Sequence, residues 1–365
     1  MYSTRAAYRD ISFARILITM ERVPDWHRTL ADTGAHTDAS GVVTGFGDPA
    51  GERRAADESA IVVPLSACGL IRVAGPDATG FLNSQLTSDV TVVSPHRAQY
   101  AGYCTPKGRL LATMLLFMRD DGLWLLLPAC LAADIAQRLR KFVLRAKVKL
   151  EVASSDMAMF GVAGLQARAG MKDTLGVVSV REFEVTQVST SSVIALPGNR
   201  YLVACPADQA GPTWLKLGAR MRPAGWYAWQ LQTIRAGIAT VTPVTQEAFI
   251  PQMLALETYD GVSFSKGCYP GQEIVARTRY LGDLKRHLYH GQCSQPLAAG
   301  NAIVEEGTNA NVGMVTDAAE NAAGDWEFLA VIQRDAVNSG KSLYCAGGAA
   351  VNALVRIGAA DGGNQ

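Results

Sequence analysis

The sequence predicts an α+β fold, with two α+β units in succession and a small C-terminal β-barrel. Two observations lead to this prediction. The order strand, helix, strand, hairpin and helix occurs twice between residues 60 and 283. After residue 284 helical periodicity stops, and short apolar runs are separated by Gly, Asn and Asp, which is typical of a small all-β domain. A chain of 365 residues is long enough to form several cores of this kind.

Composition and charge exclude several classes of protein. Apolar residues make up 48% and charged residues 18%, as in globular proteins rather than disordered ones. The 34 Lys and Arg nearly cancel the 33 Asp and Glu, so we expect no direct nucleic-acid binding. The longest apolar runs are strand-length, far below the roughly 20 residues of a membrane helix. The seven cysteines contain no C-x-x-C pair, so we expect a cytoplasmic protein without a permanent metal ion or cluster.

Residues 1–59 are predicted to be an N-terminal extension. Trp26 and Leu30, with a stop at Gly34, indicate one short helix. Residues 41–59 are rich in glycine and mixed charges and predict a flexible linker. The first nineteen residues carry no pattern, and Met20 is a candidate for an alternative start.

The first α+β unit is expected at about residues 60–152. A helix opens at Asp77, and the clearest helix of the chain, residues 131–144, has Leu131, Ile135, Leu139 and Phe142 on one face. Gly122 favours a hairpin turn between two of the strands. The strands are predicted at residues 61–65, 70–74, 98–104, 110–118, 123–127 and 148–152.

The second unit is expected at about residues 153–283. Its strands are predicted at residues 157–162, 183–188, 193–196 and 201–204, and its helices at 165–171, 212–221 and 226–236. The barrel spans residues 284–358, and residues 359–365 form a tail. Its strands are predicted at residues 288–293, 302–305, 312–316, 328–332 and 351–357.

One segment of the second unit carries a chemical signature. Gly267 and Gly271 flank Cys268, so the backbone can turn sharply there, and a helical pattern starts at Gln272. Cys268 would therefore precede a helix N-terminus, with Lys266 two residues away. Both the helix dipole and the ammonium group favour a thiolate.

Other interpretations of this segment stay open. A cysteine in a glycine-rich turn is often a small buried apolar residue, and no histidine is close in sequence to act as its base. Glu273 and Arg277 have the spacing of an ion pair on one helix face. His287 and His290 would point to opposite faces of a strand, so no metal site is predicted there.

These residues resemble a known family. Lys266-Gly-Cys-Tyr-Pro-Gly-Gln-Glu273, followed by Ala276-Arg277, is similar to the K-G-C-Y-x-G-Q-E signature of the YgfZ family. Its members are folate-binding proteins needed for iron–sulfur enzymes and tRNA modification, and are related to a eukaryotic iron–sulfur assembly factor. Gln85-Leu-Thr-Ser-Asp89 and Cys104-Thr-Pro-Lys-Gly108 resemble two further motifs of that family.

The resemblance implies a fold, a cofactor and partners. The wider superfamily includes the glycine-cleavage T-protein, in which three subdomains form a ring around tetrahydrofolate. We therefore expect a T-protein-like ring, tetrahydrofolate between the two α+β units with Cys268 facing it, and iron–sulfur enzymes or assembly proteins as partners. The candidate reactive groups are Cys268 and Lys266. The candidate folate-binding residues are Lys107, Trp229, Arg235, Tyr269, Gly271, Gln272, Glu273 and Arg277.

Three positions depart from the superfamily pattern. Ala112 and Thr113 occupy the region of the T-protein's catalytic aspartate, which argues against aminomethyl transfer because neither side chain can act as a general base. Arg235 replaces a glutamate that contacts the pterin ring. Cys68 falls where the family has a second folate-binding tryptophan beside the one at Trp229.

Three functional hypotheses follow. The leading one is an accessory protein for iron–sulfur cluster assembly or repair. The second is a folate-dependent one-carbon transferase, in which Asp89 or Glu273 would supply the acid or base. The third is a binding module in which Cys268 is structural.

Overall fold

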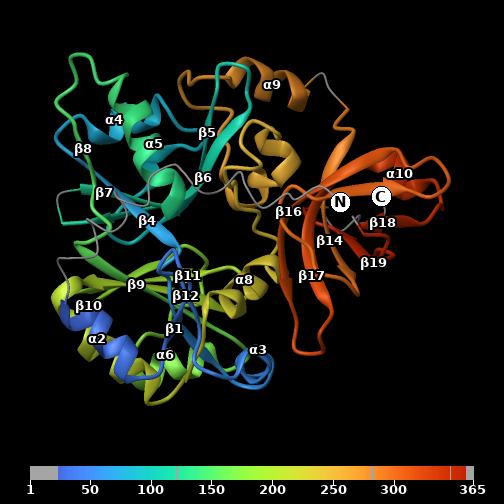
Figure 1. The fold of residues 1–365 in the computed structure, drawn as a ribbon. Coiled ribbons are helices and arrows are strands. Elements are labelled where there is room, and N and C mark those ends of the chain that lie inside the picture. The colour runs from blue at the N-terminus through green and yellow to red at the C-terminus, as the bar shows by residue number, and fades with distance from the viewer. Residues whose placement is uncertain (1–23, 121, 281–282, 346, 359–365) are drawn as a thin grey trace.

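The computed structural model describes residues 24–120, 122–280, 283–345 and 347–358. Within them, the chain forms three bodies around a common centre, with two sheets and their helices on the left of Figure 1 and a C-terminal sheet on the right. The mixed α+β class is confirmed. The candidate start at Met20 and the tail at residues 359–365 lie outside the described residues.

The first sheet is antiparallel and has the strand order β5-β6-β7-β4-β8. Its strands are β4 (Cys68–Ala74), β5 (Gln99–Cys104), β6 (Leu110–Arg119), β7 (Gly122–Pro128) and β8 (Lys149–Val152). Helices α4 (Ala78–Asn83) and α5 (Ala129–Arg140) cover one face. Leu131, Ile135 and Leu139 of α5 are buried as predicted.

Helix α5 ends four residues earlier than predicted. The guanidinium of Arg140 donates to the carbonyl of Leu150 at 2.9 Å, which fixes the helix end against β8. Phe142, expected on the buried face, therefore lies beyond the helix and is 51% exposed.

The second sheet has the order β10-β11-β12-β9-β3-β13, and here the structure corrects the boundary between the units. Its strands are β3 (Ile61–Pro64), β9 (Met157–Ala163), β10 (Val185–Val188), β11 (Ser191–Leu196), β12 (Arg200–Pro206) and β13 (Arg222–Pro223). Strand β3 was expected in the first unit, but it pairs with β9 along its whole length. A run that is buried throughout fits either sheet by its pattern, so only the pairing decides.

Residues 24–59 are folded, so the predicted linker at residues 41–59 is wrong. The described elements are α2 (Pro24–Asp32), β1 (His36–Thr37), β2 (Val43–Gly45) and α3 (Pro49–Glu58). Asp48 caps α3 by accepting from the Gly51 amide at 3.0 Å. The buried Glu52 carboxylate accepts from the amides of Phe46 and Gly225. The glycines of this segment thus serve close packing around Glu52 rather than flexibility.

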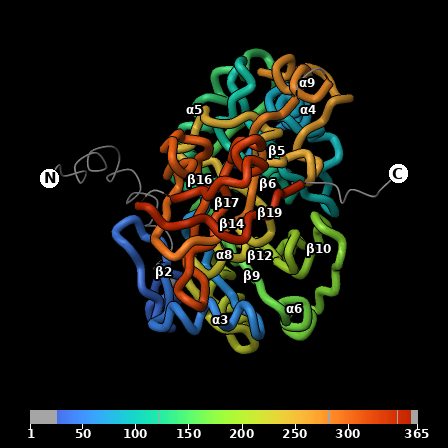
Figure 2. Tube along the Cα trace, turned by 90° about the vertical axis from the view of Figure 1, so that its right-hand side faces the viewer, coloured from blue at the N-terminus to red at the C-terminus, as the bar shows by residue number. Residues whose placement is uncertain are grey.

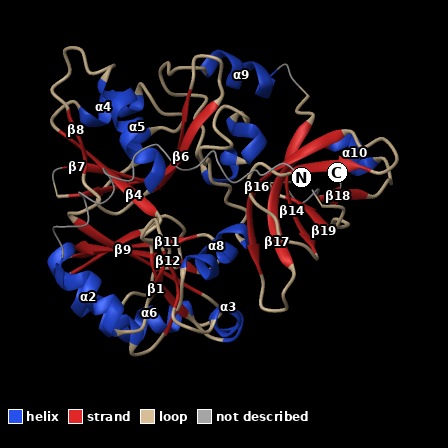
Figure 3. Ribbon diagram, in the orientation of Figure 1, coloured by secondary structure: helices blue, strands red, loops and turns tan. Residues whose placement is uncertain are grey.

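Helices α2, α6 (Ala167–Leu175) and α7 (Ala210–Gly218) cover the outer face of the second sheet, as Figure 3 shows. Trp26 anchors α2, because its ring packs edge-on against Phe160 of β9 and Trp214 of α7. The segment predicted as an extension is therefore part of the second body.

The C-terminal body is a curled sheet with the order β18-β15-β16-β17-β14-β19. Its strands are β14 (Arg286–Cys293), β15 (Ala302–Glu305), β16 (Asn311–Glu320), β17 (Trp326–Gln333), β18 (Leu343–Cys345) and β19 (Asn352–Arg356). The sequence missed β18 and the five-residue helix α10 (Arg334–Asn338). Strands β16 and β17 pack on α8 (Trp226–Arg235), in front of which they lie in Figure 2.

The inner faces of the first and second sheets share one apolar layer at the centre of the protein. Leu70 and Trp124 contribute from the first sheet, Met159 and Leu202 from the second, and Trp229 from α8. In the described part of the chain, no helix has both the length and the apolar character required to cross a bilayer.

Candidate functional site

Three segments that are far apart in the sequence meet beside α9 (Gln272–Tyr280), at the top of Figure 1. Lys266 donates through its ammonium group to the carbonyls of Leu86 at 2.6 Å and Ser88 at 2.7 Å. The Thr87 hydroxyl donates to the Gly261 carbonyl at 2.6 Å. These bonds hold the loop before α9 on the segment at residues 85–89.

The turn at residues 104–108 completes this site through two glycines. Gly271 has φ +83°, and a Cβ atom added to it would lie 2.6 Å from both the Gly108 Cα and the Thr105 carbonyl oxygen. Gly108 has φ +70° and packs under Ile274 of α9. Neither glycine can carry a side chain here, so the two motifs touch through backbone alone.

Lys266 is fixed rather than mobile. Its ammonium lies 5.0 Å from the centre of the Tyr269 ring, and burial lowers the pKa of this lysine to about 8 despite the nearby Asp89 carboxylate. Tyr269 is buried, and its hydroxyl has no hydrogen-bond partner in the described part of the chain. Burial also raises the pKa of Tyr269. Both residues thus support the loop from below.

Cys268 itself is exposed to solvent. Gly267 beside it has open space around its Cα, and Val275 is the buried residue of α9. Glu273 and Arg277 are exposed but form no ion pair with each other, contrary to the spacing argument. Exposed or half-buried side chains next to the thiol in sequence or across the glycine contact are Lys107, Gln272, Glu273 and Arg277.

We expect Cys268 to react with iodoacetamide faster than any other described cysteine. Cys130 is also exposed, but partial burial raises the pKa of its thiol and so lowers its thiolate fraction. The buried cysteines are Cys104, Cys205, Cys293 and Cys345. Peptide mapping by mass spectrometry after limited alkylation measures the order of labelling. Faster modification of Cys130 than of Cys268 would contradict the expected reactivity.

A second polar feature lies between the two sheets. Arg200, the first residue of β12, is 1% exposed. Its Nε donates to the Pro197 carbonyl at 2.9 Å, and its Nη1 donates to the Thr233 hydroxyl at 2.7 Å. Its Nη2 is buried and has no hydrogen-bond partner among the described residues. The structure thus leaves one donor of a buried cation free.

Aromatic side chains surround this cation. The guanidinium lies 5.0 Å from the centre of the Trp229 ring, and Trp229 is held against Gly161, where an added Cβ would lie 2.4 Å from the indole. Tyr100 and Tyr259 lie next to each other, and both act on Arg200: burial lowers the pKa of the arginine, and the two tyrosines partly offset this. We call Tyr100, Arg200, Trp229 and Tyr259 the inter-sheet site.

The inter-sheet site borders accessible space inside the protein. Burial raises the pKa of the Cys68 thiol to about 12, yet Cys68 keeps part of its surface accessible to solvent. A group that is deeply desolvated and still accessible faces a hollow rather than the outer surface. Tyr100, Trp226 and Tyr259 are also only partly buried against this centre. The two positions that the resemblance linked to folate, Trp229 and Cys68, therefore belong to the same interior region.

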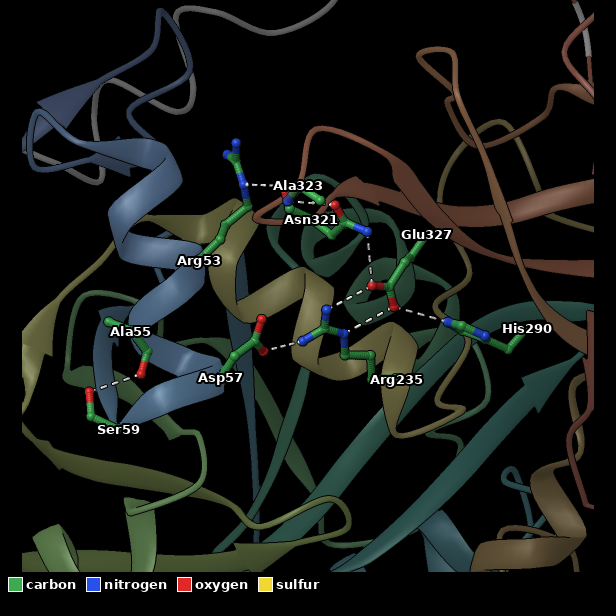
Figure 4. A network of polar contacts seen from close by, with 9 residues as sticks. All are labelled: Arg53, Ala55, Asp57, Ser59, Arg235, His290, Asn321, Ala323 and Glu327. Carbon is green, nitrogen blue, oxygen red and sulfur yellow. Dashed lines mark hydrogen bonds and ion pairs between the residues drawn. The ribbon is translucent and has the colours of Figure 1, made fainter. Parts of the chain in front are cut away.

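Arg235 lies elsewhere, in the network of Figure 4. Its Nε and Nη2 donate to the two carboxylate oxygens of Glu327 on β17, at 3.0 and 2.7 Å, and its Nη1 donates to Asp57 of α3. Glu327 also contacts the His290 ring at 3.1 Å. Burial alone would raise the pKa of Glu327, but the His290 and Arg235 hydrogen bonds lower it to about 2. Arg235 thus joins three parts of the chain.

The positions considered for acid–base chemistry are engaged in structural bonds. Ala112 is buried, and the Thr113 hydroxyl accepts from the Val241 amide at 3.1 Å. Asp89 caps a short helical turn by accepting from the hydroxyl and amide of Thr91, which lowers the pKa of this carboxyl. Sequence reasoning missed Asp317, a buried carboxyl that accepts from the Thr240 amide and has a pKa raised to about 6 by burial. Among the described residues, no group of three or more His, Cys, Asp or Glu is arranged to hold a metal ion.

Comparison with known proteins identifies the family. The model of the GCVT N-terminal domain matches residues 40–198. The tRNA-modifying protein YgfZ of Yersinia pestis (strain Pestoides F) is 31% identical over 246 residues, which cover 66% of this chain and 74% of that protein. This chain belongs to the YgfZ family.

Further comparisons agree with this membership in the YgfZ family. The YgfZ protein of Serratia proteamaculans (strain 568) is 31% identical over 281 residues, covering 75% of this chain and 84% of that protein. The aminomethyltransferase T of the glycine cleavage system from Bartonella henselae has a similar structure, with a TM-score of 0.74 at 17% identity, over 89% of this chain and 94% of that one. At this identity the likeness shows the fold, so the predicted T-protein-like architecture is confirmed.

Proposed function

We propose that this protein binds tetrahydrofolate and supports iron–sulfur cluster assembly or repair in the cytoplasm, and through iron–sulfur enzymes also tRNA modification. The observation that carries the proposal is the exposed Cys268 on a loop that three family motifs hold in place. The relatives are named as tRNA-modifying proteins, which supports the cellular process. The folate and iron–sulfur parts rest on the family resemblance.

The inter-sheet site has the chemistry that a folate requires. Trp229 and Tyr100 offer aromatic faces to a flat ring, and the free Nη2 of Arg200 would be satisfied by an acceptor oxygen. Tetrahydrofolate, when bound, supplies a carrier of one-carbon units. Trp229 and Arg200 would hold the ligand in this proposal, whereas Arg235 would act by keeping the three parts of the chain together.

Cys268 would meet the protein partner. Its exposure leaves the sulfur open to an iron–sulfur enzyme or assembly protein, to which it can present a transiently bound group. Lys107, Gln272, Glu273 and Arg277 surround it with polar groups of both signs, so we assign them to contact with that partner rather than to the inter-sheet site.

In cells that lack this protein, Cys268→Ala is expected to restore neither iron–sulfur enzyme activity nor tRNA thiomethylation, whereas the wild type restores both. The matched control is Cys130→Ala, which removes the other exposed thiol but lies outside the motifs and should rescue fully. Both variants should melt like the wild type because both side chains are exposed. Full rescue by Cys268→Ala would favour the pure binding module instead.

A further inference from the structure

Arg200 is a buried cation without a matching anion. No ion pair joins it to a carboxylate among the described residues, and its two hydrogen bonds go to neutral oxygens. Taking a guanidinium out of water is costly unless charge and hydrogen bonds compensate, and here one amidinium nitrogen is left without an acceptor. A buried group of this kind calls for a missing partner.

The surroundings of Arg200 limit what the partner can be. Trp229 stacks on the guanidinium, and Tyr100 and Tyr259 enclose the same space with aromatic rings. These walls suit a flat heteroaromatic ring with an acceptor oxygen at its edge. A flexible carboxylate tail fits less well, because burying two hydrated negative charges against one arginine would leave a net buried charge.

The position of Arg235 supports the same assignment. In the superfamily, that position is a glutamate, which accepts hydrogen bonds from the pterin ring. Here both sides of the arginine fork are occupied by Glu327 and Asp57. Recognition of a ring edge must then come from another side chain, and Arg200 has the free buried donor.

We propose that Arg200 selects the ring of the ligand, by donating from Nη2 to the carbonyl oxygen of a 4-oxopteridine bound in the inter-sheet site. This inference rests on the proposed folate binding and adds the ring position that is recognised. A 4-amino ring presents a donor at that position and is also more readily protonated, so it would face the arginine with no acceptor and like charge.

The test compares two ligands that differ only at this position, folic acid and its 4-amino-4-deoxy analogue, by titration calorimetry on the full chain. We expect the wild type to bind the 4-oxo compound about 10- to 100-fold more tightly, the range of a hydrogen bond from a charged donor. In Arg200→Gln the ratio should fall to within about threefold, the tolerance of such comparisons. Arg119→Gln, at a half-buried arginine that bonds the Ala204 carbonyl, should keep the wild-type ratio.

Each outcome decides one claim. If neither compound nor tetrahydrofolate binds the wild type, the folate function itself fails. If they bind the wild type with equal affinity, the folate function stands and the role of Arg200 is overturned. Pteroic acid, which lacks the glutamate tail, should keep the preference for the 4-oxo ring over its own 4-amino form, and loss of that preference would place Arg200 on the tail. The ratio in the wild type decides the question even if Arg200→Gln does not fold.

Discussion

Arg235→Ala is expected to lower the free energy of unfolding by about 3–5 kcal/mol, the usual cost of breaking a buried ion pair by removing one partner. Glu327 is the reason, because its side chain is 5% exposed and would keep its charge without the two-pronged donor. The His290 contact would remain, but a single ring nitrogen cannot replace both bonds. Since α3, α8 and β17 meet at this point, the loss should loosen the junction of the three parts.

The same interaction predicts a pH dependence. The folded-state pKa of Glu327 is about 2, against an ordinary value of 4.5, so its contribution is complete above about pH 4.5 and declines as the pH falls towards 2. The difference in stability between wild type and Arg235→Ala should therefore be large at pH 7 and shrink below pH 4.5. Urea unfolding at a series of pH values measures it. Arg334→Ala, which removes the exposed pair with Asp283, should change stability far less, and an equal loss would show that burial is not the cause.

Periodicity predicted most of the elements but not which sheet each strand joins. Helix α5 and the hairpin before Pro128 follow from patterns within a few residues of each other. Strand β3 carries apolar residues on both faces, so nothing in its own sequence separates pairing with β4 from pairing with β9. Glycine content misled the analysis at residues 41–59, because glycines that allow close packing look like glycines that allow motion.

The candidate site divides in the same way. The motif around Cys268 is local, so its turn, its exposed thiol and its following helix could be anticipated from the order of residues. Arg200 could not, because an arginine that opens a strand is usually a surface charge. Its meaning arises only when Trp229 and Tyr100, from other elements, close around it. Similarly, the spacing of Glu273 and Arg277 allowed an ion pair, but it does not form.

Gly271→Ala is expected to lower the free energy of unfolding by about 2–4 kcal/mol, from the strain of a left-handed backbone at a residue with a Cβ and from overpacking. The added atom would lie 2.6 Å from the Thr105 carbonyl oxygen and from the Gly108 Cα, both of them backbone and unable to move alone. The turn at residues 104–108 and the Cys268 loop would have to separate. In the complementation assay, this variant should therefore fail as Cys268→Ala does, although the thiol is still present.

Gly267→Ala provides the matched control, because it makes the same substitution one residue from the thiol. A Cβ there meets nothing within 4 Å, and the backbone of Gly267 is not left-handed. Stability and rescue should both stay near wild type. If both alanine variants rescued equally, contact between the two motifs would not be what presents the thiol. If Gly271→Ala kept wild-type stability but lost function, the glycine would act on the partner directly. Only loss of both, with Gly267→Ala intact, ties the position of the sulfur to the meeting of the two glycines.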